Sequence, residues 1–135
     1  MIRTRFVPSL RWSIRRLIST SLPARMPALT RLSALQRETL VQPLLASGWT
    51  LNSDPIAKRE SITRSFTFPS FSEAFAFMTR VAIAAEKADH HPEWENVYNR
   101  VRVELTTHDA GNSVSEKDIH LASLMNEFAK GLEGK

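Results

Sequence analysis

A chain of 135 residues without cysteine is long enough for one domain and excludes disulfides, cysteine-ligated metal sites and thiol nucleophiles. Its net charge of +4 is unevenly distributed, because six arginines and no acidic residue lie within residues 1–25. The remaining chain carries 12 basic and 14 acidic residues, which gives no reason to expect nucleic acid as a partner. No apolar run approaches the roughly 20 residues that a membrane-spanning helix needs, so we expect no membrane partner.

Residues 1–25 have the composition of a basic leader. They are rich in arginine and serine and lack acids, which is typical of an organellar transit peptide. On a helix, Leu10, Ile14 and Leu17 would share one face, with most of the arginines off it. We expect an import signal, with a mitochondrial destination favoured over a plastid; a disordered basic tail is the alternative. Translation from Met26 would give a cytoplasmic form with a complete domain.

The body, residues 26–135, is expected to form a single domain that begins with a helix and two strands. Ser33 and Gln36 form a capping-box pattern, leucines follow at helical spacing, and Gly48 ends the helix. Two strands separated by a turn are expected next: 49–51, the turn 52–55, and 61–68. One side of the second strand carries three apolar residues and an arginine: Ile62, Phe66, Phe68 and Arg64.

A long helix is expected from about residue 71 to residue 88. Ser70 and Glu73 form a second capping-box pattern at its start. Most of its apolar residues fall on one face: Phe71, Ala74, Phe75, Met78, Val81, Ala82 and Ala85. Phe77 and Ile83 widen this stripe beyond what one sheet needs, which indicates either a subunit interface or a well-buried helix.

The C-terminal part is expected to add two strands and a last helix. A third strand is expected to begin at 97–98, and the alternation over 100–107 predicts a fourth. The last helix is expected from about Glu116 and is closed by Gly131 and Gly134. The order α-β-β-α-β-β-α predicts an α+β fold, in which a four-stranded antiparallel sheet carries helices packed on one face.

Three of the four histidines lie within nineteen residues, at the edges of expected elements. Histidine can both donate and accept a proton near neutral pH, so His90, His91 and His108 predict acid–base chemistry on a flat, polar ligand. Glu86 lies one helical turn before His90 and could hold its imidazole. Trp94 offers a stacking surface. The carboxylates that could orient the histidines are Glu86, Asp89 and Asp118.

Two other interpretations of the histidines stay open. They could cap a helix end, where the helix dipole favours a positive imidazole. A zinc site would be satisfied by ligand count, but adjacent histidines on an extended segment point in opposite directions, and the chain has no His-x-x-x-His pair. The sequence also lacks a glycine-rich phosphate loop and a serine in a nucleophile-elbow context.

A longer motif joins these residues: Glu86-x-x-x-His90-His91-Pro92, then Tyr98, His108 and Asp118. In this spacing the chain resembles the pterin-4a-carbinolamine dehydratase family over about residues 30–130. The resemblance implies the same fold and a homodimer or homotetramer assembled through the long helix 71–88. It also implies dehydration of 4a-hydroxytetrahydropterin to quinonoid dihydropterin in tetrahydrobiopterin recycling, without a metal or cofactor.

The resemblance further implies individual roles. His90 would be general base and acid, His108 an acid for the opposite hydroxyl face, and His91 chiefly a binder of the pterin. Asp118 would contact the histidines without contacting the substrate. The remaining substrate-binding residues would be Glu86, Asp89, Pro92 and Trp94.

An interaction module is the alternative function. Animal relatives of this family also act as dimerisation partners of a homeodomain transcription factor. The apolar stripe of the long helix, including Phe75, Phe77 and Met78, would serve such a role. A third interpretation is a pterin-binding protein in another pathway, such as folate- or molybdopterin-related metabolism in an organelle. The intact histidine trio favours the enzyme.

Overall fold

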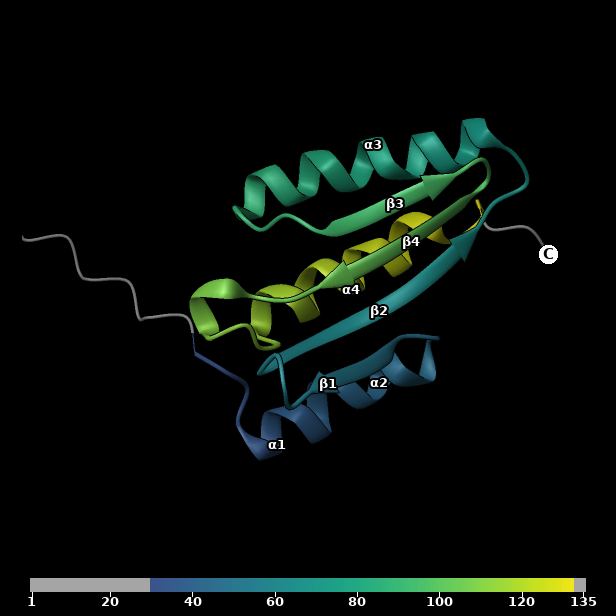
Figure 1. Ribbon diagram of the computed structural model, residues 1–135. Coiled ribbons are helices and arrows are strands. Elements are labelled where there is room, and N and C mark those ends of the chain that lie inside the picture. The colour runs from purple at the N-terminus through teal and green to yellow at the C-terminus, as the bar shows by residue number, and fades with distance from the viewer. Residues whose placement is uncertain (1–29, 133–135) are drawn as a thin grey trace, which may run out of the picture.

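The described part of the chain, residues 30–132 of a computed structural model, forms a four-stranded antiparallel sheet with helices on one face (Figure 1). The predicted leader and Gly134 lie outside these residues. The strand order across the sheet is β1-β2-β4-β3. The strands are β1 Thr50–Asp54, β2 Arg59–Thr67, β3 Glu93–Val97 and β4 Arg100–Leu105. The predicted α+β fold and its order of helices and strands are therefore confirmed.

Helices precede, connect and follow the strands. The first helical stretch begins at Ser33, which forms the predicted capping box with Gln36. This stretch consists of α1 Ala34–Gln36, a π-helical turn Arg37–Val41 and α2 Gln42–Ala46. The later helical segments are α3 Phe71–Ala88, a 3₁₀ turn His108–Ala110 and α4 Glu116–Ala129. No helix within residues 30–132 is long and apolar enough to cross a membrane.

The core lies between the sheet and the helices. Helix α4 contacts both α3 and α2, which places it between them behind the sheet (Figure 1). Alternate side chains of the two central strands point into this layer and are fully buried: Ile62, Phe66, Val101, Val103 and Leu105. Burying a side chain of this size contributes about 1.5–3 kcal/mol. The well-packed central strands therefore fix the positions of the connections that follow or precede them.

Helix α3 buries a narrower stripe than the sequence predicted. Its buried residues follow the spacing of three and four that puts side chains on one line: Ala74, Phe77, Val81 and Ala85. The Phe77 ring packs 4.8 Å from the ring of Phe66 and 5.0 Å from that of Phe68, between ring centroids. Three large apolar side chains stay about half exposed: Phe71, Phe75 and Ile83. Phe77 is therefore buried and cannot contribute to the surface that the interaction-module alternative assigned to it.

Two turns lie at different positions from those predicted. Strand β1 continues to Asp54, and the turn follows it, because Asp54 Oδ1 accepts the backbone N–H groups of Ile56 at 2.8 Å and Ala57 at 2.9 Å. Val97 ends β3 instead of beginning a strand, and Tyr98, with φ of 55°, turns the chain into β4. The third strand thus starts at Glu93, and only Pro92 separates it from the histidine pair.

Candidate active site

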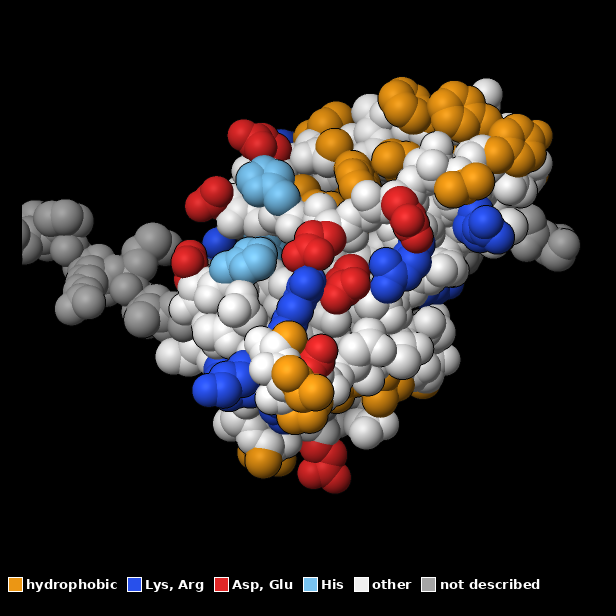
Figure 2. All heavy atoms as spheres, in the orientation of Figure 1, with side chains coloured by type: hydrophobic (Ala, Val, Ile, Leu, Met, Phe, Trp, Pro, Cys, Tyr) orange, Lys and Arg blue, Asp and Glu red, His pale blue; other side chains and the backbone are white. Residues whose placement is uncertain are grey.

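Two connections at the same end of the sheet bring the three clustered histidines together. His90 and His91 lie between α3 and β3, and His108 follows β4, whose end pairs with the start of β3. An open pocket of about 450 Å³ lies between these connections and is lined by all three histidines, together with Asp89 and Pro92. Figure 2 shows histidine side chains at the surface of this end, next to charged groups.

His90 is the buried histidine of the pair. The chain leaves α3 through Asp89, whose φ of 46° and ψ of 51° are left-handed. The His90 backbone N–H donates to the Ala85 carbonyl at 3.1 Å, and its side chain is 8% exposed. Lys117 Nζ donates to the Asp89 carbonyl at 2.9 Å. This turn, held from α4, directs the His90 ring inward and leaves His91 outside.

Asp118 is fully buried and ties His90 to the start of α4. Its Oδ1 lies 2.8 Å from His90 Nε2, and its Oδ2 accepts the Thr107 hydroxyl at 2.6 Å and the Ser115 backbone N–H at 2.8 Å. Because the carboxylate serves as acceptor in the other two bonds, we assign the shared proton to His90 Nε2. No residue of the described range is bonded to His90 Nδ1. That nitrogen can therefore exchange a proton with a ligand.

Glu86 contacts the other adjacent histidine. Its Oε2 lies 3.0 Å from His91 Nε2, and both side chains are well exposed, at 81% for Glu86 and 62% for His91. The prediction that Glu86 holds His90 is therefore wrong. Successive side chains of an extended connection point to opposite sides, so only one of the two histidines can turn outward to Glu86.

His108 lies on the other side of the pocket. Its Nδ1 is 2.9 Å from Asn112 Oδ1, and its Nε2 is 3.8 Å from Glu93 Oε1, with the ring 74% exposed. Glu93 also accepts a hydrogen bond of 2.7 Å from Arg59 Nη2. This hydrogen bond raises the pKa of Arg59 above its ordinary value, with a further contribution from the charge of Glu104. The Glu93 carboxylate beside His108 is thus shared with the permanently charged guanidinium of Arg59.

Trp94 does not line this pocket. Strand alternation turns it toward the helices, where it packs half-buried against the core beside its register partner Val103. The pocket instead includes five residues that the sequence pattern did not single out: Glu93, Thr106, Thr107, Asp109 and Lys117. The position of Asp118 at the start of α4 could have been predicted from the sequence, since Ser115 and Asp118 form a capping box there.

A metal centre has no support in this geometry. Within residues 30–132 no group of three histidine, aspartate or glutamate side chains is arranged to hold a metal ion. His90 is bonded to Asp118, whereas His91 turns to Glu86 on the outside. The arrangement therefore favours proton transfer by separate imidazoles on the two sides of a small ligand.

Comparison with known proteins identifies the family. A sequence model of the pterin 4 alpha carbinolamine dehydratase family matches residues 30–128. The chain belongs to this family. A relative from Nitrobacter winogradskyi is 53% identical over 104 residues, which cover 77% of this chain and 96% of the relative. One from Rhodopseudomonas palustris is 52% identical over 99 residues, which cover 73% and 91%. Both carry the name pterin-4-alpha-carbinolamine dehydratase provisionally. The predicted family and its enzyme class, a hydro-lyase, are confirmed.

Solved structures agree with this assignment. A Brucella melitensis protein described as a transcriptional coactivator/pterin dehydratase is 47% identical and superposes with a TM-score of 0.65, covering 74% of this chain and 99% of its own. A pterin dehydratase-like protein described as a RuBisCO assembly factor in the alpha-carboxysome is 20% identical, with a TM-score of 0.50 over 61% of this chain and 89% of its own. The second likeness supports the fold alone.

Proposed function

We propose that the protein dehydrates a 4a-hydroxytetrahydropterin to the quinonoid dihydropterin by histidine acid–base catalysis. Membership of the dehydratase family supports a pterin as the substrate. The observation that carries the catalytic assignment is the pocket in which His90, bonded to a fully buried Asp118, faces the exposed His108.

The reaction needs one base and one acid. A base removes the proton from N5 of the pterin, the electron pair forms the C4a–N5 double bond, and the C4a–O bond breaks. An acid gives its proton to the departing hydroxyl, which leaves as water. The protein neither gains nor loses a proton over the whole cycle, which suits two imidazoles that exchange protons near neutral pH.

His90 is the base in this proposal. Asp118 holds Nε2–H at 2.8 Å, so Nδ1 carries the lone pair, and the carboxylate stabilises the imidazolium that forms when Nδ1 takes a proton. His108 is the acid, because its exposed ring can be reprotonated from solvent after each turnover. A positioned acid or base of this kind contributes typically about 10²- to 10⁴-fold to the rate.

The other pocket residues bind and orient the pterin. His91, held by Glu86 on the outside, presents a hydrogen-bonding ring to the polar edge of the substrate. Asp89 and Pro92 line the pocket between the two histidine connections. The half-buried Trp94 packs toward the core and has no role in this proposal.

The setting is tetrahydrobiopterin recycling, and the assembly is a homodimer or homotetramer through α3. The support for assembly is the exposed apolar surface of that helix, where Phe71, Phe75 and Ile83 are 47%, 56% and 55% exposed. Figure 2 shows apolar side chains gathered over α3. Mitochondrial import through residues 1–25 stays a prediction.

A second candidate function is an interaction module that uses the same face of α3. Its support is the apolar surface just described, and the Brucella relative described as a transcriptional coactivator. In that case the face would bind another protein in place of a second copy of this chain. The oligomeric state of the pure chain distinguishes self-assembly from binding of another protein, since a stable homotetramer would cover the apolar face of α3.

Single histidine variants test the catalytic proposal. The decay of freshly generated 4a-hydroxytetrahydropterin is followed by absorbance with the full chain, His90→Ala, His108→Ala and the control His120→Ala. His120 is exposed on α4 and does not line the pocket. We expect a loss of about 10²-fold in kcat for each of the first two and wild-type turnover for the control. Equal turnover by all four proteins would contradict the proposal.

A further inference from the structure

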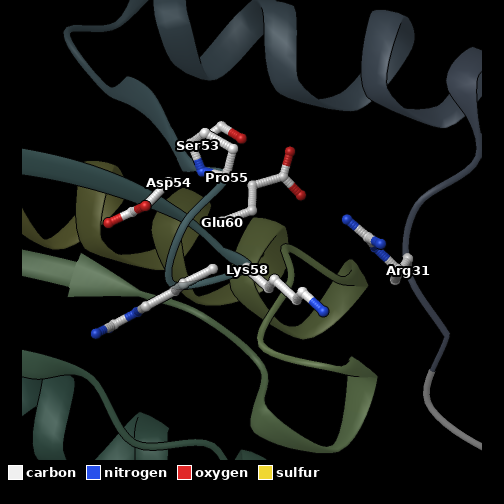
Figure 3. Close-up of a pocket in the computed structure, with 7 residues that line it drawn as sticks. Arg31, Ser53, Asp54, Pro55, Lys58 and Glu60 are labelled. Atoms are coloured by element: carbon white, nitrogen blue, oxygen red, sulfur yellow. The ribbon is translucent and has the colours of Figure 1, made fainter.

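A second pocket lies beside the turn that joins β1 to β2. It has a volume of about 280 Å³ and is lined by the segment before α1, the turn itself and the start of β2. Figure 3 shows Arg31 and Lys58 extending toward the same open space, with Glu60 on another side. The histidine pocket is lined by different residues.

The two carboxylates of this second pocket already have partners. Asp54 Oδ1 accepts the backbone N–H groups of residues 56–57. Glu60 is held by the Arg37 guanidinium, with Nη2 2.6 Å from Oε2, and the Val114 backbone N–H donates to Oε2 at 3.4 Å. The hydrogen bond from Arg37 is the main cause that lowers the pKa of Glu60. The charge of Glu60 is therefore balanced by Arg37, whereas Asp54 is hydrogen-bonded, within residues 30–132, only to neutral backbone groups and keeps its negative charge.

Two cations of the pocket are left without a partner of their own. Arg31 and Lys58 form no hydrogen bond or ion pair with any residue in the range 30–132, and Arg31 attracts Glu60 only weakly. The third cation, Arg59, directs its guanidinium to Glu93 at 2.7 Å and Glu104 at 3.3 Å. Because Asp54 offsets one of these two charges, the pocket carries an excess of one positive charge, on two exposed cationic side chains.

The backbone at Lys58 has an uncommon conformation. Its φ of 50° lies in the left-handed region, which glycine adopts without strain and lysine does not. A glycine would close this turn more easily. A positive φ is uncommon for lysine, and here the Lys58 side chain extends toward the cavity (Figure 3).

The second pocket is also joined to the catalytic loop. The Glu60 backbone N–H donates to the Asn112 carbonyl at 2.8 Å, and the Thr106 hydroxyl donates to the Glu60 carbonyl at 2.8 Å. Asn112 holds the His108 ring through its side chain. These hydrogen bonds connect Glu60, which lines the second pocket, with the segment that carries His108.

We propose that Arg31 and Lys58 form a binding site for a small oxyanion, a phosphate or a carboxylate group. A guanidinium matches two oxygens of such a group with paired N–H donors, and an ammonium adds a point charge. The oxyanion comes either as a free small anion or as the end of a substrate side chain. Only the second source rests on the proposed pterin dehydratase function.

Titration of the full chain with inorganic phosphate tests the site without any use of turnover. Amide NMR shifts of residues 53–60 report the binding. We expect saturation with a Kd on the order of 1 mM, about tenfold weaker binding in Lys58→Gln and Lys58→Gly, and wild-type binding in the exposed-lysine control Lys130→Ala. Lys58→Gly should also unfold at a higher temperature than Lys58→Gln, because it relieves the strained backbone. Shifts that do not saturate, or equal binding by all variants, would overturn the proposal.

Turnover separates the two sources of the anion. If a substrate side chain supplies it, Lys58→Gln raises KM about tenfold for a pterin that ends in carboxylates and leaves KM unchanged for a pterin with a neutral side chain. If a free anion supplies it, neither KM changes, while phosphate still binds the wild type. Both results support the site. Phosphate binding together with a complete lack of turnover would contradict the dehydratase proposal and leave the oxyanion site supported.

Discussion

Replacing Asp118 by asparagine removes one charge from the buried carboxylate that holds His90. The amide oxygen of the variant can still accept the Thr107 hydroxyl and the Ser115 N–H, so the start of α4 is kept. The amide NH₂ then faces His90 Nε2 and donates to it. The imidazole is forced to carry its proton on Nδ1, which is the nitrogen that the proposed mechanism needs as a base.

The size of the effect follows from the 2.8 Å contact between the carboxylate and the imidazole. A hydrogen bond to a charged group contributes about 1.5–3 kcal/mol, and this one strengthens only when His90 becomes an imidazolium. Its loss should lower kcat by roughly 10- to 150-fold, with a further loss from the wrong tautomer. KM should change little, because the pterin does not contact Asp118 in this mechanism.

Stopped-flow dehydration of 4a-hydroxytetrahydropterin measures this change directly. Glu127→Gln is the matched control, since it removes one carboxylate charge from an exposed position of the same helix. We expect wild-type rates for the control and a thermal unfolding midpoint for Asp118→Asn that shows a folded protein. A folded Asp118→Asn protein that keeps more than half of the wild-type kcat would refute the assigned role of the carboxylate.

Three further predictions concern the fold, the assembly and the binding of the pterin. Glu60 has a lowered pKa because Arg37 donates a hydrogen bond to it. Its contribution to stability is therefore complete above the unfolded-state pKa of about 4.3 and disappears as the pH falls through the folded-state pKa. Acid unfolding curves of the wild type should show this loss of stability, and those of Glu60→Gln should not. Phe77→Ala should reduce the free energy of unfolding by about 3–5 kcal/mol, whereas Phe75→Ala should chiefly weaken the oligomer measured by sedimentation. The reverse result would contradict the assignment of Phe77 to the buried face of α3 and Phe75 to its exposed face. Glu86→Gln should raise KM a few-fold with kcat nearly unchanged, and a fall in kcat alone would argue that Glu86 acts on the chemistry.

Much of the fold could be predicted because several signals agree locally. The capping box at Ser33 and Gln36 begins the first helix in the structure as in the sequence, and strict alternation over β4 identifies Val101 and Val103 as core residues. The stripe of α3 was harder to predict. Apolar residues surround much of that helix, so the sequence period alone could not decide whether Phe75 or Phe77 faces the sheet.

The partners of the histidines depend on contacts between distant parts of the chain. His90 and Asp118 are 28 positions apart, and their contact forms only when α4 packs beside the end of α3. The left-handed turn at Asp89 decides which histidine points inward. Aspartate adopts this conformation more readily than most residues, but residue type alone does not fix it. Glu86, one helical turn before His90, was therefore a reasonable but wrong partner for it.

The double variant His90→Ala/His108→Ala removes both proposed catalytic imidazoles at once. The observed first-order decay of freshly generated 4a-hydroxytetrahydropterin is compared between the full wild-type chain, the folded double variant and buffer alone. We expect rapid decay with the wild type and a rate equal to that of buffer with the double variant. Wild-type decay that is no faster than in buffer, or a double variant that is as fast as the wild type, would contradict it.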